Sequence, residues 1–227
     1  MIIPGNEIHI YRSSLESSSE LLKQYESLLS PDEFQKAYRY KFEKDRDHFI
    51  TGRAFLRNIL AKYLNQSPDK IIFSYSDKGK PFIRHSNLKF NLAHSGGKAV
   101  FAFAEKAEVG IDIEYMRELP DALQIAKRFF SEEEVNEILK VRDDEIRSAF
   151  FNCWTRKEAF IKAVDEGLSY PLKDFTVTLI PGVNPEIKWI KDKVDEVKEW
   201  KLVNIQTDEN YISSLAVKAA EVILIYK

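Results

Sequence analysis

Cysteine is almost absent from this chain of 227 residues, which contains only Cys153. An internal disulfide needs two cysteines, so none can form, and metal sites built from several thiolates are excluded as well. A reduced, cytoplasmic setting is the simplest expectation. Cys153 stands next to Trp154 in an apolar stretch, which favours a buried structural thiol over a nucleophile.

Long apolar runs and a surplus of positive charge are also missing. No stretch approaches the roughly 18 consecutive apolar residues of a membrane-spanning helix. The first residues, MIIPGNEIHIYR, lack the basic and apolar regions of a signal peptide. With 34 Lys and Arg against 36 Asp and Glu, the formal net charge is -2. That balance argues against a general binder of nucleic acid or of membrane surfaces.

What is present is an ordinary globular composition, with 44% hydrophobic and 31% charged residues. Segments typical of helices and strands recur in the same order in both halves. Ser30–Glu33 and Ser131–Glu134 are both typical of capped helix starts, and each precedes a long amphipathic helix. Within those helices, 52–57 (GRAFLR) lines up with 157–162 (KEAFIK). We predict a pseudo-twofold α+β duplication with halves at 1–107 and 108–227 and a ligand cleft between them.

Periodicity and turn residues predict where the individual elements lie. Helices are expected at 14–29, 44–64 and 147–168, and Gly167 is expected to end the last of them. Strands are expected at 8–11, 71–75, 88–92, 99–104 and 109–114. A His-Ser-Gly-Gly turn is expected at 94–97.

Asp112 and Glu114 are two residues apart in a run typical of a strand, so both side chains lie on one face. Two neighbouring carboxylates repel each other unless a cation lies between them, and oxygen ligands suit Mg²⁺. Glu158 is the candidate third ligand. The alternative is a solvent-facing strand that happens to carry acidic residues.

The predicted helix at 147–168 carries Glu158 and Lys162, which are four apart and therefore neighbours on one surface. The pair is either part of a site or a solvated ion pair. His94, in its predicted turn, is either aimed at an anion together with backbone N–H groups or simply exposed. A basic cluster in the first half is either a phosphate-binding surface or a solvated helix face; it comprises Lys36, Arg39, Lys41, Arg46, Arg53 and Arg57.

Several of these stretches, in this order, resemble the signature motifs of the Sfp-like (surfactin-synthetase-activating) 4′-phosphopantetheinyl transferases. They are FNLAHS at 90–95, GIDIE at 110–114 and WTRKEAFIK at 154–162, together with GKP at 79–81 and AKRFFS at 126–131. The resemblance runs from about Ser30 to Val177. Three ordered motifs with compatible spacing are far more specific than any one of them.

The resemblance implies a monomeric pseudo-dimer with coenzyme A bound between the halves. It implies transfer of the phosphopantetheine arm to a serine of an acyl or peptidyl carrier protein, releasing adenosine 3′,5′-bisphosphate. Asp112, Glu114 and Glu158 would hold Mg²⁺ against the coenzyme A pyrophosphate, which Lys162 would neutralise. The resemblance implies that coenzyme A is bound by Lys36 (at the 3′-phosphate), Arg53, Lys80, His94, Ser95, Asp112 and Lys162.

The sequence departs from the family pattern at Glu33, where a basic residue is usual, at Ala93 and at Asp165. The catalytic residues implied are Glu158, Lys162 and His94. We hypothesise that Glu158 takes the serine proton, directly or through a metal-bound water, and that Lys162 stabilises or protonates the leaving group. Two alternatives remain, a Mg²⁺-dependent phosphoesterase or nucleotide hydrolase and a non-enzymatic coenzyme A-binding module.

Overall fold

The computed structural model describes residues 2–227, apart from the side chain of residue 168. The first half contains β1 (Glu7–Ser14), α1 (Ser19–Glu26), α2 (Pro31–Ala37), α3 (Glu43–Leu64), β2 (Ser74–Tyr75), β3 (Pro81–Phe82), β4 (Leu88–Ser95) and β5 (Lys98–Glu105). The second half contains β6 (Val109–Tyr115), α4 (Ala122–Phe129), α5 (Glu132–Ile138), α6 (Ile146–Val164), β7 (Phe175–Val177), β8 (Ile187–Ile190), β9 (Trp200–Asn204) and β10 (Tyr211–Lys218).

The two halves have the same topology. A strand, three helices, a two-stranded hairpin sheet and two further strands follow one another in each. The strand order is β1-β5-β4 in one sheet and β6-β10-β9 in the other, with antiparallel neighbours throughout. The predicted α+β class and pseudo-duplication are therefore confirmed. A last strand, β11 (Ile223–Tyr226), runs parallel to β1 and so joins the sheet of the first half.

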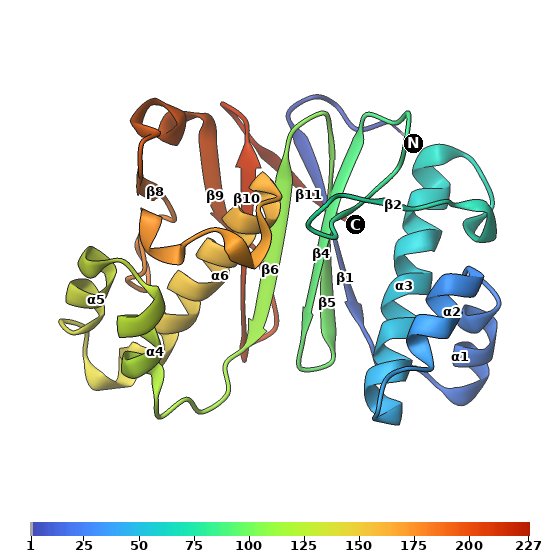
Figure 1. Ribbon diagram of the computed structural model, residues 1–227, viewed down its shortest axis with the longest axis horizontal. Helices are drawn as coiled ribbons and strands as arrows, with labels where there is room; N and C mark the ends of the chain where they lie inside the picture. The colour runs from blue at the N-terminus through green and yellow to red at the C-terminus, as the bar shows by residue number, and fades with distance from the viewer. Residues whose placement is uncertain (1) are drawn as a thin grey trace.

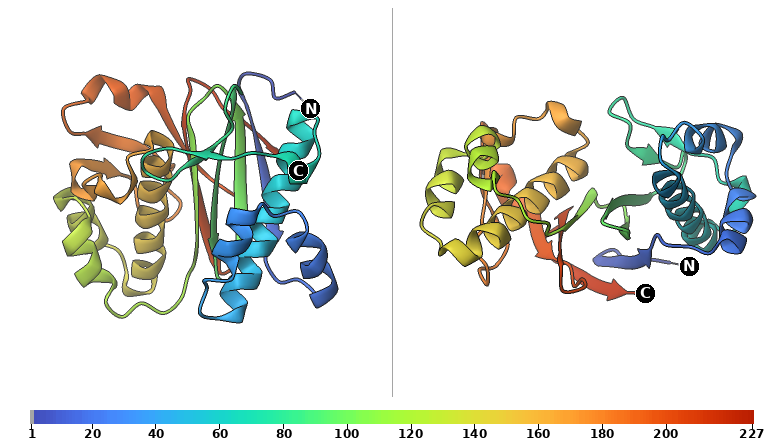
Figure 2. Two further views of the ribbon diagram at one scale, coloured as in Figure 1. Left: turned by 45° about the vertical axis from the view of Figure 1, so that its right-hand side comes forward. Right: turned by 90° about the horizontal axis from the view of Figure 1, so that it is seen from below.

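Helices flank the molecule on both sides, and the two main sheets lie between them (Figure 1). One apolar core fills the space between α3 and the first sheet, and another lies between α6 and the second. A third core lies between the sheets and contains apolar residues of β1, β4, β5, β6 and β10. The views in Figure 2 show the helices of each half on the outer side of its sheet. Burial of the inner core holds the two halves together.

A buried ion pair fastens the short capped helix to the long helix in each half. Glu33 completes the capping box of α2 and lies 2.7 Å from Arg57 of α3. Glu134 completes the capping box of α5 and lies 2.8 Å from Lys157 of α6. All four side chains are at most 2% exposed, and removing one partner from such a pair is strongly destabilising.

These twin ion pairs correct the predicted alignment of the two long helices. Arg57 corresponds structurally to Lys157, because each bonds the equivalent glutamate and also donates to backbone carbonyls beyond its helix. The predicted alignment instead placed Arg57 opposite Lys162. The similarity of GRAFLR and KEAFIK therefore reflects shared amphipathic character and not equivalent positions.

Several predicted boundaries were also wrong. β1 continues to Ser14, so the first helix covers only Ser19–Glu26, and the strand expected at 71–75 shrinks to Ser74–Tyr75. α6 ends at Val164, where Asp165 takes the left-handed conformation (φ 58°) that was expected of a glycine. Cys153 is fully buried, as predicted. Across residues 2–227, no helix has both the length and the apolar character needed to span a bilayer.

Candidate functional site

β6 carries the two predicted carboxylates on the face that α6 covers. Val109, Ile111 and Ile113 point the other way, into the core between the sheets. Asp112 is 5% exposed, and its Oδ1 accepts a hydrogen bond of 2.6 Å from Nζ of Lys162. Its Oδ2 is buried and has no hydrogen-bond partner within the described residues. Asp112 thus presents one paired and one free oxygen, which is an unusual state for a buried carboxylate.

Gly110 allows α6 to lie directly against this strand. A Cβ atom at that position would be 2.1 Å from the carbonyl oxygen of Ala159 and 2.3 Å from the backbone nitrogen of Ala163. Helix and strand backbones are therefore nearly in contact, and this close approach brings Lys162 to Asp112. Glu158 lies one helical turn before Lys162, so both side chains face the same region.

β4 contributes from the other half. Ser95 donates a hydrogen bond of 2.7 Å from its Oγ to Oε2 of Glu114. The turn predicted at 94–97 is wrong in extent, since His94 and Ser95 still pair with Ala99 and Lys98 as part of the β4–β5 ladder. Only Gly96 and Gly97 form the turn, and both have positive φ as a tight hairpin requires.

The charges of these side chains perturb one another. Burial raises the pKa of Asp112 to about 7, with Lys162 opposing the rise and Glu114 and Glu158 adding to it. Burial also raises the pKa of Glu158, again opposed by Lys162. Partial burial, followed by the Lys162 ammonium, lowers the pKa of His94. Carboxylates with raised pKa values beside a cation are typical of functional sites.

The structure therefore brings six of the predicted site residues together, from three elements and both halves; they are His94, Ser95, Asp112, Glu114, Glu158 and Lys162. Sequence reasoning missed Asn91, whose Oδ1 accepts a hydrogen bond of 2.9 Å from the backbone N–H of Ile111 in β6. The available signal was a polar residue between two large apolar ones, Phe90 and Leu92, in a predicted strand.

Two basic residues that are predicted to bind phosphate, Lys36 and Arg53, lie outside this group of six residues, in α2 and α3. Lys36 is exposed, with its Nζ 5.3 Å from the ring centroid of Phe49. The side chain of Arg53 is largely buried. Its Nε lies 3.4 Å from Oε1 of Glu33, and its guanidinium group lies over the ring of Phe73. Nη1 of Arg53 has no partner in the described residues, so one guanidinium nitrogen is unused there. Glu33, the departure from the family pattern, is thus an anchor for α3.

Lys80 connects the hairpin of the first half to α6. Its Nζ donates to the carbonyl oxygens of Lys162 (2.7 Å), Val109 (3.2 Å) and Ala163 (3.3 Å). Burial lowers the pKa of this ammonium. These bonds hold the end of α6, and the phosphate contact that the resemblance implies for Lys80 stays a prediction. Cations at a helix C-terminus are favourable.

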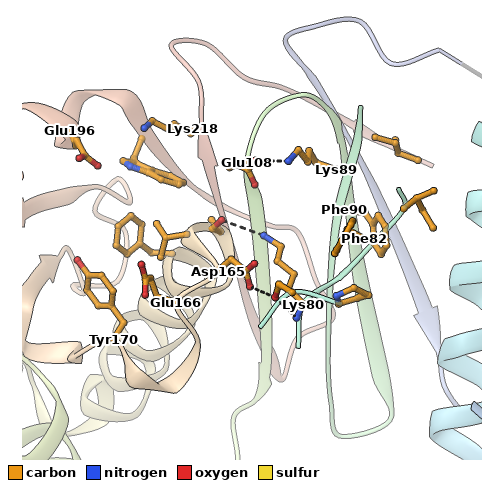
Figure 3. A pocket seen from close by; sticks show the side chains of 18 of the residues that line it. Lys80, Phe82, Lys89, Phe90, Glu108, Asp165, Glu166, Tyr170, Glu196 and Lys218 are labelled. Atoms are coloured by element: carbon orange, nitrogen blue, oxygen red, sulfur yellow. Dashed lines mark hydrogen bonds and ion pairs between the residues drawn. The ribbon is translucent and has the colours of Figure 1, made fainter. Parts of the chain in front are cut away.

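Lys80 also separates two pockets. On one side, a pocket of about 260 Å³ is lined by Asn91, Glu158 and Lys162 as well as by the hairpin. On the other side, a pocket of about 540 Å³ lies beyond the end of α6 (Figure 3). Figure 3 shows Lys80 reaching toward the end of α6, with Tyr170 and Glu166 on one side and Phe82 and Phe90 on the other. Of the three carboxylates of the candidate site, Glu158 lines the first of these two pockets, and none lines the second.

Replacing Lys80 with methionine is expected to lower the free energy of unfolding by about 1–3 kcal/mol, because carbonyl oxygens at the end of α6 lose their donor in a half-buried place. Urea unfolding followed by circular dichroism measures this. Lys78→Met is the matched control, since exposed Lys78 makes one hydrogen bond, to Ser169. Equal losses in the two variants would contradict the helix-holding contact.

The 4′-phosphopantetheinyl transferase superfamily model matches residues 108–216, and the model of a 4′-phosphopantetheinyl transferase N-terminal domain matches residues 14–106. The solved structure of Thermotoga maritima holo-[acyl-carrier-protein] synthase aligns with 49% of this chain and 62% of its own, at 21% identity and a TM-score of 0.39.

Curated relatives match over most of their length. The 4′-phosphopantetheinyl transferase HetI of Nostoc sp. is 33% identical over 217 residues, which are 94% of this chain and 88% of HetI. The 4′-phosphopantetheinyl transferase Sfp of Bacillus subtilis is 35% identical over 163 residues, 71% of either protein. This chain therefore belongs to the 4′-phosphopantetheinyl transferase superfamily and is a transferase enzyme.

Proposed function

We propose that this protein transfers the 4′-phosphopantetheine arm of coenzyme A to a serine of an acyl carrier protein or of a peptidyl or polyketide carrier domain. Adenosine 3′,5′-bisphosphate is the other product, and the protein acts as a monomer with its ligand between residues 1–107 and 108–227. The observation that carries the proposal is the buried Asp112, paired with Lys162 through one oxygen and unpartnered at the other, beside two further carboxylates.

The donor set suits Mg²⁺ in its chemistry. Asp112, Glu114 and Glu158 supply only oxygen, which a hard cation prefers, and the free Oδ2 of Asp112 lacks a partner that a cation would provide. Within residues 2–227, however, no three His, Cys, Asp or Glu side chains are already arranged around a common point as a metal site. When bound, Mg²⁺ would neutralise charge on the pyrophosphate. Lys162 shares that region, being bonded to Asp112.

In the proposed reaction, the serine Oγ attacks the phosphorus that carries the pantetheine arm. An O–P bond forms to serine, and the bond from that phosphorus to the bridging oxygen of the pyrophosphate breaks. Glu158 accepts the serine proton, a task that its raised pKa suits. Lys162 and His94, which are close enough to perturb each other's charge, stabilise the departing phosphate in this proposal.

A third, largely apolar pocket of about 630 Å³ borders Glu158, and we assign the pantetheine arm to it. Its walls include Phe129, Trp154, Ile161 and Leu172. The arm is uncharged but carries a hydroxyl group and two amides, so it suits a pocket with apolar walls and a few polar groups. A ligand whose arm lay here would have its reacting phosphate next to Glu158, which lines both this pocket and the one that contains Lys162.

The decisive experiment incubates the protein with coenzyme A, Mg²⁺ and an apo carrier protein and weighs the carrier by mass spectrometry. We expect the carrier to gain one phosphopantetheine group and adenosine 3′,5′-bisphosphate to appear in equal amount. Hydrolysis of coenzyme A without gain on the carrier would support a phosphoesterase instead. Binding of coenzyme A without either product, with several carriers tried, would support a binding module.

The stabilisation of the protein by Mg²⁺ is expected to depend on pH, and this can be measured without an activity assay. Burial raises the pKa of Asp112 from 3.8 to about 7, so the folded protein holds an extra proton between those values and loses stability as the pH rises through that window. A bound cation competes with that proton. Mg²⁺ should therefore raise the melting temperature more at pH 8 than at pH 5.5.

Thermal unfolding of wild type and of Asp112→Asn at both pH values, with and without Mg²⁺, measures this effect. The variant should lose the Mg²⁺-dependent shift. Asp69→Asn is the matched control, because Asp69 is an exposed carboxylate in a short turn far along the chain from the site, and it should keep the shift. A Mg²⁺ shift that survives in Asp112→Asn would contradict the proposed ligand.

A further inference from the structure

The seam between β4 and β6 lacks a backbone ladder. In the described chain, β4 pairs only with β5, and β6 pairs only with β10, although β4 and β6 run close to each other. A buried backbone N–H without a partner is costly, so the amides of β6 that face the seam require acceptors from somewhere else. Side chains of β4 provide them for Ile111 and Tyr115.

Besides the Ser95–Glu114 bond, two β4 side chains accept from backbone amides of β6 with matched spacing. Oδ1 of Asn91 accepts from the backbone N–H of Ile111 at 2.9 Å, and Oγ of Ser95 accepts from that of Tyr115 at 3.1 Å. Acceptors and donors are each four residues apart, so the strands run in the same direction here and are fixed over about 13 Å. The Asn91 bond is the buried one, with Asn91 only 6% exposed.

This bond sets the position of the candidate site, because its two ends are close in sequence to the residues that carry the chemistry. Ile111 directly precedes Asp112, and Asn91 lies three residues before His94 on the same strand. A shift of β6 along β4 would carry Asp112 and Glu114 away from His94. Asn91 also lines the pocket that contains Glu158 and Lys162.

We infer that Asn91 is a positioning residue, which holds the carboxylates of one half in register with the histidine of the other by accepting the Ile111 N–H. The inference rests on the proposed function for its kinetic consequence but not for its structural one. Misplacement of a catalytic group by about 1 Å can slow a reaction by about 10²-fold. The apolar core between the sheets supplies adhesion, but apolar contact is non-directional and does not by itself set register.

Two variants of nearly the same size test this inference. Asn91→Leu removes the acceptor, whereas Asn91→Asp keeps an oxygen in its place. With leucine, we expect kcat for phosphopantetheine transfer to fall about 10²-fold, while KM for coenzyme A changes less than about threefold. Aspartate should recover at least about tenfold of that loss, because it restores the bond that sets the register. A leucine variant within about twofold of the wild-type kcat, or an aspartate variant no better than leucine, would overturn the inference.

Hydrogen exchange gives a readout that is independent of activity. The Ile111 amide should exchange at least about tenfold faster in Asn91→Leu than in wild type and should remain protected in Asn91→Asp. Unchanged exchange at Ile111 in the leucine variant would overturn the inference even if transfer were slow. If the wild type transferred nothing while Ile111 behaved as expected, the proposed function alone would fail.

Val100→Ala is the control for simple loss of stability at the seam. Val100 is 1% exposed in the core between the sheets and makes none of the side-chain hydrogen bonds across it. Its truncation should lower the urea midpoint and leave kcat within about twofold of wild type. If Val100→Ala reduced kcat as much as Asn91→Leu at a similar loss of stability, Asn91 would be merely structural.

Discussion

Transfer of phosphopantetheine by Glu158→Gln is expected to be about 10²–10⁴-fold slower than by wild type, the range that general-base catalysis contributes. Glutamine has nearly the shape of glutamate but cannot accept the serine proton. Burial already raises the pKa of Glu158, so its carboxylate is a better base than an exposed one. The change should lower kcat and leave binding of coenzyme A largely intact. Single-turnover transfer to an apo carrier protein measures the chemical step directly.

Glu166→Gln is the matched control, because Glu166 is an exposed glutamate just beyond the same helix and lines the pocket on the far side of Lys80. It should transfer at the wild-type rate. Mg²⁺ binding, measured by thermal shift, must be checked in Glu158→Gln as well. Near-normal transfer by that variant with intact Mg²⁺ binding would show that another group takes the proton.

Gly110→Ala should destabilise the protein by about 3 kcal/mol or more, at the upper end of what overpacking costs. The added methyl group would stand 2.1 Å from the carbonyl oxygen of Ala159, and backbone cannot rotate away as a side chain can. α6 would have to retreat from β6 by roughly 1.5 Å to restore ordinary van der Waals separation. That retreat would lengthen the contact between Lys162 and Asp112, so transfer by the folded fraction should fall about 10²-fold.

Urea unfolding and steady-state transfer on the same preparation separate the two effects. Gly5→Ala is the control, since a Cβ there would meet nothing within 4 Å. A soluble Gly110→Ala protein with wild-type stability would show that helix and strand are less tightly packed than the structure indicates. Full activity at reduced stability would show that the site tolerates the retreat of α6.

Local signals in the sequence predicted the architecture well. The Ser-x-x-Glu starts of α2 and α5 formed capping boxes because that chemistry is complete within four residues. Alternation placed Asp112 and Glu114 on one strand face, and i,i+4 spacing placed Glu158 beside Lys162, for the same reason. Motif resemblance then assigned those residues to one site, which periodicity alone could not do.

What could not be predicted depends on contacts between distant residues. Lys80 donates hydrogen bonds to carbonyl oxygens 29 to 83 residues away, which no local pattern reveals, and its predicted phosphate contact stays a prediction. Lys157 lies in the middle of a signature motif and is fully buried against Glu134, which no helical period reveals. The helix ended at Asp165 and not at Gly167, because asparagine and aspartate also tolerate the left-handed conformation.

Because β11 pairs with β1, the last strand of the chain belongs to the sheet of the first half and ties the two halves together. After a protease cut between β5 and β6, the C-terminal fragment would still add its last strand, β11, to the edge of the sheet in the N-terminal fragment. The two pieces would also keep the apolar layer between them. Such a nicked protein should survive gel filtration as one particle and come apart only in denaturant, which makes the loop between Glu105 and Val109 a natural place to build a split reporter.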